Sequence, residues 1–203
     1  NKGVKLQIGH IERFNPAILA VEDLIKEPKF IECHRLSPYR PRGTDVDVVL
    51  DLMIHDLDII LHFLKKEPVK VDAVGIPVLS SKVDIANVRI TFEGGEVANI
   101  TASRVSAEKM RKIRFFQRNS YFSIDYLNRD VQAFLKDEDG ILPMFPPVKK
   151  NLEPLKIEIE AFLRSILEDK APPVTGEDAL RALSLGLWIT RSIADHLSRV
   201  STD

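Results

Sequence analysis

The stretch Val46–Leu64, VDVVLDLMIHDLDIILHFL, constrains the fold of this chain more than any other part of the sequence. Its length and pattern predict a helix whose circumference is aliphatic or aromatic almost all the way round. At about 100° per residue, four polar side chains gather within roughly 60° of one another, with Asp56 lying apart. These four are Asp51, His55, Asp58 and His62. A helix that is apolar all round is normally buried, so we expect the polar stripe to face a cavity.

Length and charge exclude several classes of protein. The 203 residues suffice for one large domain or two small ones with a substantial core. With 29 basic and 30 acidic residues the net charge is −1, so we expect neither a nucleic-acid partner nor a membrane partner. Cys33 is the single cysteine, which excludes an internal disulfide and fits a cytoplasmic location.

The order of the expected elements predicts an α+β fold. A helix capped at Asn15-Pro16 should run to about Lys26, and a strand should follow over Phe30–Ser37. Six further strands rich in β-branched and aromatic residues should form a meander. Their ranges are Val69–Leu79, Val83–Phe92, Glu96–Arg104, Lys112–Arg118, Tyr121–Tyr126 and Val131–Lys136. A proline-containing linker, Leu142–Pro147, should lead to two final helices, Leu152–Leu167 and Glu177–His196. We therefore expect one mainly antiparallel sheet with helices.

Asp51 and His55 are the best candidates for chemistry. They lie four residues apart, so on an α-helix their side chains would reach each other. A carboxylate beside an imidazole fixes the ring tautomer and raises the basicity of the ring. Such a pair can exchange a proton with a substrate hydroxyl near neutral pH. The alternative is a buried histidine whose hydrogen bonds are satisfied locally, in a binding or oligomerisation module without catalysis.

A metal site is a further alternative. His55, Asp58 and His62 share one face of the expected helix, and His10 or His34 could complete a ligand set for a metal-dependent hydrolase. The H-E-x-x-H order of zinc proteases is absent, so we expect no metal.

Several basic residues could recognise an anionic substrate. Tyr39, Arg40 and Arg42 lie in a Pro- and Gly-containing loop just before the central helix, and arginine suits phosphate and carboxylate groups. Arg104 ends an expected strand, and Arg13 lies where strand becomes helix. None of the nine glycines forms a G-x-G-x-x-G or P-loop motif.

Four segments together resemble the Gfo/Idh/MocA oxidoreductases. They are GHIERFNPA near the start, DVVLDLMIHDLDI in the central helix, ANVRITFEGGEVANITASR in the strands, and VTGEDALRAL near the end. The resemblance covers essentially the whole chain, and it implies the C-terminal domain type of this family, an open, mainly antiparallel sheet with helices on one face.

The resemblance also implies a domain order. An amino-terminal Rossmann domain would bind NAD or NADP, and this chain would begin with its last strand, Val4–Gly9. We therefore expect residues 1–12 to be the junction and residues 13–203 to be a substrate-binding and oligomerisation domain. The family's catalytic lysine lies in an E-K-P motif; Lys26-Glu27-Pro28 and Lys66-Glu67-Pro68 have another order and do not match it.

The resemblance assigns roles residue by residue. Asp51 and His55 take the acidic and histidine positions beside the hydroxyl that is oxidised. Arg13 and Asn15 match the junction motif near cofactor and substrate. The subgroup resembles dehydrogenases of sugars and sugar nucleotides, which makes Tyr39, Arg40, Arg42 and Arg104 candidates for diphosphate or sugar contacts. The sheet would form the interface of a homodimer or homotetramer.

Overall fold

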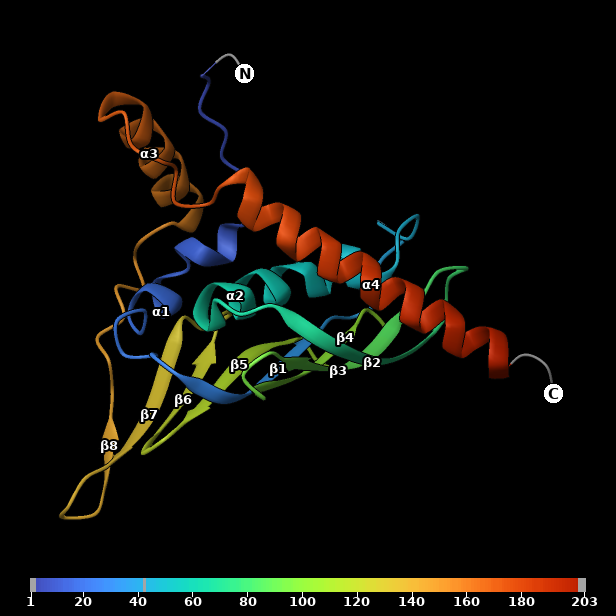
Figure 1. Cartoon of the computed structure of the whole chain (residues 1–203), viewed down its shortest axis with the longest axis horizontal. Coiled ribbons are helices and arrows are strands. Elements are labelled where there is room, and N and C mark those ends of the chain that lie inside the picture. Colours follow the sequence, from blue (N-terminus) through green and yellow to red (C-terminus); the bar gives the residue numbers. More distant parts are fainter. Residues whose placement is uncertain (1–2, 42, 201–203) are drawn as a thin grey trace.

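A long open sheet lies beneath two helices in the computed structural model, which describes residues 3–41 and 43–200 (Figure 1). The eight strands are hydrogen-bonded in the order β2-β3-β4-β1-β5-β6-β7-β8. They span β1 Pro28–Leu36, β2 Pro68–Ile76, β3 Ile85–Phe92, β4 Val97–Ser103, β5 Met110–Gln117, β6 Ser120–Asp125, β7 Asp130–Lys136 and β8 Ile141–Met144. The α+β class and the mainly antiparallel sheet predicted from the sequence are confirmed.

The first strand interrupts the predicted meander. β1 lies between β4 and β5, parallel to β4 and antiparallel to β5. The prediction of one uninterrupted meander was therefore wrong. Sequence periodicity reports which face of a strand is buried, whereas the choice of neighbour depends on contacts far along the chain. As a result, the loop that leaves β1 emerges beside the loop that leads into β5.

The core lies between the sheet and its helices. The central helix consists of a π-helical turn η2, Val49–Met53, followed by α2, Ile54–Leu64. The long helix α4, Gly176–Val200, crosses the same face of the sheet (Figure 1). Alternate residues of each strand point into this core, as Ala86, Val88 and Ile90 do in β3. The opposite face of the sheet has no helix over it among the described residues (Figure 1).

The start of the chain differs from prediction in two places. Val4–Gly9 was expected as a strand, but no ladder partner lies beside it among the described residues, and it has no regular structure. The expected helix from Pro16 to Lys26 was also too long. After the 3₁₀ turn η1, Ile11–Phe14, helix α1 covers only Pro16–Leu19. Turns follow, in which the amides of Val21 and Leu24 donate to carbonyls three residues back, and Val21 and Ile25 are buried without a continuous helix.

The end of the expected linker is a strand. Ile141–Met144 pairs with β7 at the edge of the sheet, so Leu142–Pro147 is a linker only in part. Pro143 is tolerated there because an edge strand needs no ladder hydrogen bond on its outer side. Helix α3, Pro154–Leu167, stands at this end of the molecule near η1 (Figure 1). No helix in the described ranges is long and apolar enough to cross a membrane.

Candidate functional site

The central helix begins with a π-helical turn. The Ile54 amide donates to the Val49 carbonyl, five residues back. Asp47 caps the turn, since its Oδ1 accepts from the amides of Val49 at 3.0 Å and Leu50 at 2.9 Å. Turns of this kind are rare and occur frequently at functional sites. The turn changes the direction in which the first half of the helix points its side chains.

The predicted hydrogen bond between Asp51 and His55 is not formed. The His55 Nδ1 is buried without a partner among the described residues, and the Asp51 carboxylate lines a pocket instead. The reason is the π turn: it holds about one more residue per turn than an α-helix, so residues four apart across it no longer stack. The geometric basis of the predicted pair was wrong, although both residues remain candidates.

The surroundings of His55 favour its neutral form. Burial lowers the pKa of His55, and the positive charge of Arg35 lowers it further. The imidazole of His10 lies edge-on to that of His55, with ring centroids 6.4 Å apart. The sequence predicts that Asp51 raises the basicity of His55, whereas in the structure burial and Arg35 dominate and the pKa of His55 is lowered. A neutral imidazole at pH 7 is the form that can accept a proton.

A buried ion cluster lies beside His55. Arg35, from β1, donates to Asp56 through Nε at 2.8 Å and Nη2 at 2.9 Å, and to Glu12 through Nη1 at 3.1 Å. Its guanidinium also lies 5.5 Å from the ring centre of Tyr126. The sequence analysis did not find this cluster. The available signal was that Arg35 shares its side of a strand with buried residues and that Asp56 stands outside the polar stripe.

The junction residues Arg13 and Asn15 have partners within the protein. Arg13 donates to the Asp58 carboxylate through Nε at 2.7 Å and Nη2 at 2.9 Å, and its Nη1 contacts His62. Asn15 caps α1 by accepting from the Ala17 amide, and its side-chain nitrogen donates to neighbouring oxygens. These contacts anchor η1 against α2. A role of Arg13 or Asn15 toward substrate or cofactor stays a prediction.

The same contacts argue against the metal alternative. Asp58 and His62, two of its three ligands, both face the positive guanidinium of Arg13. No group of three or more histidine, cysteine or acidic side chains in the described ranges is arranged to hold a metal ion.

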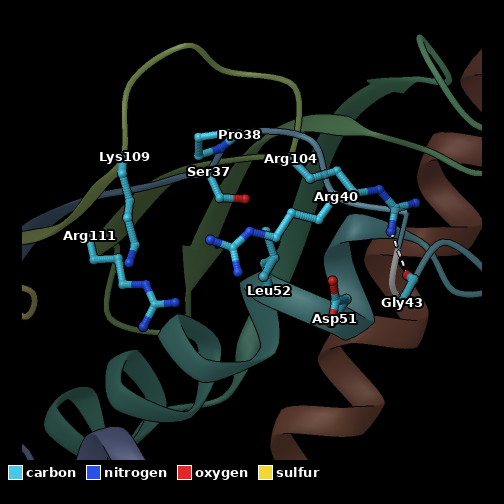
Figure 2. Close-up of a pocket in the computed structure, with 9 residues that line it drawn as sticks. All are labelled: Ser37, Pro38, Arg40, Gly43, Asp51, Leu52, Arg104, Lys109 and Arg111. Carbon is cyan, nitrogen blue, oxygen red and sulfur yellow. Dashed lines mark hydrogen bonds between the residues drawn. The ribbon is translucent and has the colours of Figure 1, made fainter.

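A pocket of about 400 Å³ opens where the central helix meets the ends of β1 and β4 (Figure 2). Its walls come from the loop after β1, the π turn, the end of β4 and the start of β5. The lining residues are Ser37, Pro38, Arg40, Gly43, Asp51, Leu52, Arg104, Lys109 and Arg111. Of the predicted substrate-binding residues, Arg40 and Arg104 are therefore brought together here. Tyr39 is on the same loop but is not part of the lining, and Arg42 lies outside the described residues.

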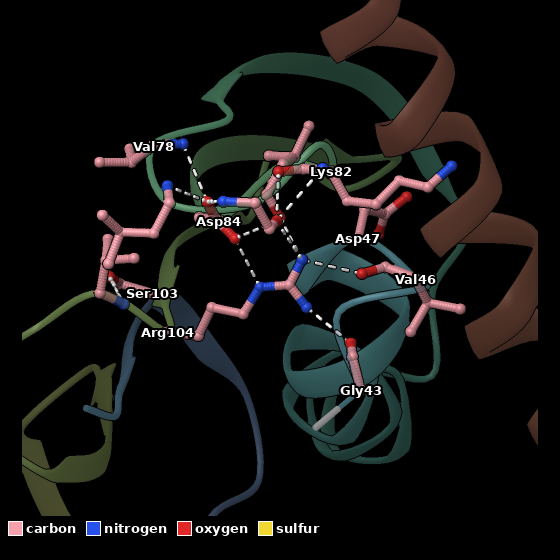
Figure 3. Close-up of polar contacts among 12 residues, drawn as sticks. Gly43, Val46, Asp47, Val78, Lys82, Asp84, Ser103 and Arg104 are labelled. Atoms are coloured by element: carbon pink, nitrogen blue, oxygen red, sulfur yellow. Dashed lines mark hydrogen bonds and ion pairs between the residues drawn. The ribbon is translucent and has the colours of Figure 1, made fainter. Parts of the chain in front are cut away.

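Arg104 is buried in a wall of this pocket, with 4% of its surface exposed. Its Nε donates to Asp84 at 2.8 Å, Nη1 to the Gly43 carbonyl at 2.8 Å, and Nη2 to the carbonyls of Val46 at 2.9 Å and Val83 at 3.2 Å (Figure 3). We call Arg104 and Asp84 the clasp. It joins the end of β4 to the loop that precedes the central helix, and so it fixes the position of the pocket wall that this loop forms.

The acid of the clasp is held ionised by its neighbours. Its Oδ2 accepts from the amides of Val78, Leu79 and Ser80, all at 2.7–2.8 Å. Burial alone would raise the pKa of Asp84, but the hydrogen bonds from Ser80, from these amides and from Arg104 hold it well below its usual range. The charge of Arg104 is thus neutralised inside the protein.

Lys109 and Arg111 are the charged lining residues that were not predicted from the sequence. Arg111 is opposite Arg35 in the β1–β5 pairing and so points to the helix-covered face. With β1 placed beside β5, the short run Lys109-Met110-Arg111 would have drawn attention, because it then faces the arginine loop. Without that pairing, both residues read as ordinary surface charges.

Comparison with known proteins shows which family this chain resembles. Residues 27–120 match the family model described as GFO/IDH/MocA C-terminal domain. Residues 27–120 thus carry the features of a Gfo/Idh/MocA C-terminal domain. It is 36% identical over 201 residues to UDP-N-acetylglucosamine 3-dehydrogenase from Acidithiobacillus ferrooxidans, covering 96% of this chain and 64% of that protein. It is 26% identical over 212 residues to inositol 2-dehydrogenase from Rhizobium meliloti, covering 94% of this chain and 63% of that protein.

A solved structure agrees with this assignment. UDP-N-acetylglucosamine 3-dehydrogenase GnnA from Acidithiobacillus ferrooxidans superposes with a TM-score of 0.88 at 34% identity, over 94% of this chain and 63% of that one. The family resemblance seen in the sequence is confirmed. The chain spans slightly less than two thirds of the length of these relatives.

Proposed function

We propose that this chain is the substrate-binding part of an NAD(P)-dependent oxidoreductase that oxidises a hydroxyl group of a sugar or sugar nucleotide. The observation that carries the proposal is the position of His55. Its neutral, half-buried imidazole lies three residues after the pocket-lining Leu52, which is about 4.5 Å further along the helix axis. A proton acceptor and a substrate pocket are thus adjacent on one element. The relatives named above are dehydrogenases of sugar derivatives and inositols.

The reaction separates into a hydride and a proton. Oxidation of a secondary alcohol to a ketone breaks the C–H bond, whose hydrogen leaves with both electrons to the nicotinamide ring, and the O–H bond, whose hydrogen leaves as a proton. We assign the proton to His55, because an imidazole with a lowered pKa is unprotonated near pH 7. Asp51, in the pocket wall, would accept a hydrogen bond from a neighbouring sugar hydroxyl and orient the ring.

The residues described here do not form a dinucleotide site. The sequence contains no glycine-rich fingerprint. Arg13, the residue expected near the cofactor, has its guanidinium engaged by Asp58 and His62. We therefore assign cofactor binding to a nucleotide-binding domain of the kind that the family resemblance implies, preceding a junction at residues 1–12.

The test of the proposed function is the turnover of the complete gene product with His55→Ala. Loss of a general base typically lowers kcat about 10²–10⁴-fold, and we expect a fall in that range at saturating substrate. The matched control is His196→Ala, near the far end of α4, which should leave kcat within twofold. Unchanged kcat in His55→Ala would remove His55 from the reaction and favour a binding module without catalysis.

We also propose that the uncovered face of the sheet joins copies of the chain into a homodimer or homotetramer. Phe116, Tyr121 and Phe134 form a row of aromatic contacts on this face, and 44% of the Phe134 surface is exposed. Aromatic residues of this kind are enriched at protein interfaces. Multi-angle light scattering should give at least twice the monomer mass. A charge introduced by Phe134→Glu should reduce that mass; an unaltered oligomer would place the interface elsewhere.

A further inference from the structure

We propose that the pocket in front of the clasp binds the diphosphate of a nucleoside-diphosphate sugar through Arg40, Lys109 and Arg111. This inference rests on the proposed function and narrows it, because it selects sugar nucleotides over free sugars. Lys109 and Arg111 have no role in the function proposed above.

The charges of the lining point to a polyanion. Four cations line the pocket against one carboxylate, that of Asp51. Arg104 is neutralised by Asp84 at 2.8 Å, which leaves three cations. Within the described ranges, Arg40 and Lys109 take part in no ion pair, and Arg111 has only a 3.8 Å contact with Glu12. Three cations with so little compensation would repel one another, so an anion of charge −2 or more is the ligand that stabilises them.

The side chains are also placed to converge on one ligand. Figure 2 shows the Arg40 guanidinium turned toward the side of the pocket on which Lys109 and Arg111 lie. Ser37, at the end of β1, brings a hydroxyl group to the same wall (Figure 2). Guanidinium and ammonium groups that approach from different elements suit the several oxygens of a diphosphate. The cavity of about 400 Å³ lies in the size range of small-molecule sites, about 300–1,000 Å³.

The position of His55 on the central helix favours a sugar nucleotide among diphosphates. In such a molecule the diphosphate is bonded directly to the sugar ring, so a ring hydroxyl lies only a few ångströms from the phosphate oxygens. His55 lies about one helical turn beyond the pocket-lining Leu52. A diphosphate held at the three cations would therefore present its sugar toward the proton acceptor.

Arg104 has a different part in this arrangement. All three nitrogens of its guanidinium donate to protein oxygens, on Asp84, Gly43, Val46 and Val83. It therefore positions the loop that carries Arg40, whereas Lys109 and Arg111 contact the ligand. This assignment replaces the sequence-based expectation that Arg104 itself contacts the diphosphate.

The test is calorimetric titration of this 203-residue chain with UDP, using uridine, inorganic pyrophosphate and NAD as separate probes. We expect UDP and pyrophosphate to bind with an affinity that falls as salt is raised, and uridine to bind at least tenfold more weakly. Lys109→Ala and Arg111→Ala should each weaken UDP binding about tenfold or more, since each removes a charge-assisted contact. The control is Lys112→Ala, whose side chain points to the opposite face of the sheet from Arg111, and which should bind UDP as the unaltered chain does.

Three results would overturn the inference: equal affinity for UDP and uridine, Lys109→Ala and Arg111→Ala variants that bind UDP normally, or NAD binding at the same cations more tightly than UDP. The last would assign the pocket to the cofactor. Because this assay measures no turnover, its outcome is independent of the His55→Ala test. Turnover without UDP binding here would reject the pocket assignment alone, and UDP binding without turnover would reject the proposed function alone.

Discussion

Replacing Asp84 by asparagine tests how strongly the clasp holds the pocket together. The substitution keeps the shape of the side chain but turns one carboxylate oxygen into an NH₂ group. One oxygen of Asp84 accepts from the amides of Val78, Leu79 and Ser80, and the other accepts from Arg104 Nε at 2.8 Å and Ser80 Oγ. An asparagine that keeps the first set must point its NH₂ group at the Arg104 donor.

The magnitude follows from burial. Asp84 has no exposed surface and Arg104 has 4%, so Asp84→Asn leaves a buried guanidinium without its counter-charge. Breaking a buried ion pair by removing one partner costs about 3–5 kcal/mol. We therefore expect the free energy of unfolding to fall by about 3–5 kcal/mol in urea denaturation followed by the fluorescence of Trp188. The control is Asp72→Asn, an exposed residue paired with Lys70, which should change that energy by less than about 1 kcal/mol.

The pH dependence gives a second readout. The pKa of Asp84 is lowered on folding, so its contribution to stability is present above the ordinary carboxyl pKa of about 3.9 and is lost as the pH falls below it. The unaltered chain should lose stability in this acid range more steeply than Asp84→Asn. Two results would refute the argument that this ion pair holds the pocket wall. One is that Asp84→Asn lowers the free energy of unfolding by less than about 1 kcal/mol at pH 7. The other is that the free energies of unfolding of the two proteins fall in parallel as the pH is lowered.

Two further predictions concern the surroundings of His55. Arg35→Met leaves Asp56 and Glu12 buried without their cation and should lower the free energy of unfolding by about 3–5 kcal/mol in urea. The control is Arg89→Met, at an exposed position of β3, which should lower that energy by less than about 1 kcal/mol. Equal losses in the two variants would contradict the argument that Arg35 stabilises a buried cluster. Because burial and Arg35 lower the pKa of His55 from 6.5, kcat/KM of the complete gene product should fall only at pH values below 6.5, as the proton acceptor becomes protonated. An acid limb centred above 6.5 would refute the assigned direction.

The spacing of apolar residues in the sequence predicted most helices and strands, because each of them buries one face in the core. In β3, Ala86, Val88 and Ile90 alternate with more exposed residues, and that alternation is visible in the sequence. The same holds for the apolar circumference of α2. Elements without such a face were mispredicted: Val4–Gly9 has too few partners to form a strand, and β8 was taken for a linker because of Pro143 and the prolines that follow the strand.

The site was harder to predict because it depends on contacts between distant segments. Lys109 and Arg111 join the pocket only because β1 pairs with β5, and periodicity carries no information on that pairing. In the sequence, Arg104 looks like an unpaired cation at the end of a strand. In the structure, the oxygens that accept its hydrogen bonds come from loops 20 and about 60 residues away in sequence. A sequence shows that a charge exists but not what neutralises it.

The polar stripe of the central helix shows how one local deviation divides a surface into two functions. On an ideal α-helix, Asp51 and Asp58 would point the same way and their charges would act together. The π turn at Val49–Met53 rotates Asp51 toward the pocket, while Asp58 stays against Arg13. His55 lies between them, and burial, together with the positive charge of Arg35, lowers its pKa. The same helix therefore anchors the fold at one end and exposes a carboxylate to the pocket at the other, and His55, the proposed proton acceptor, lies between these two ends.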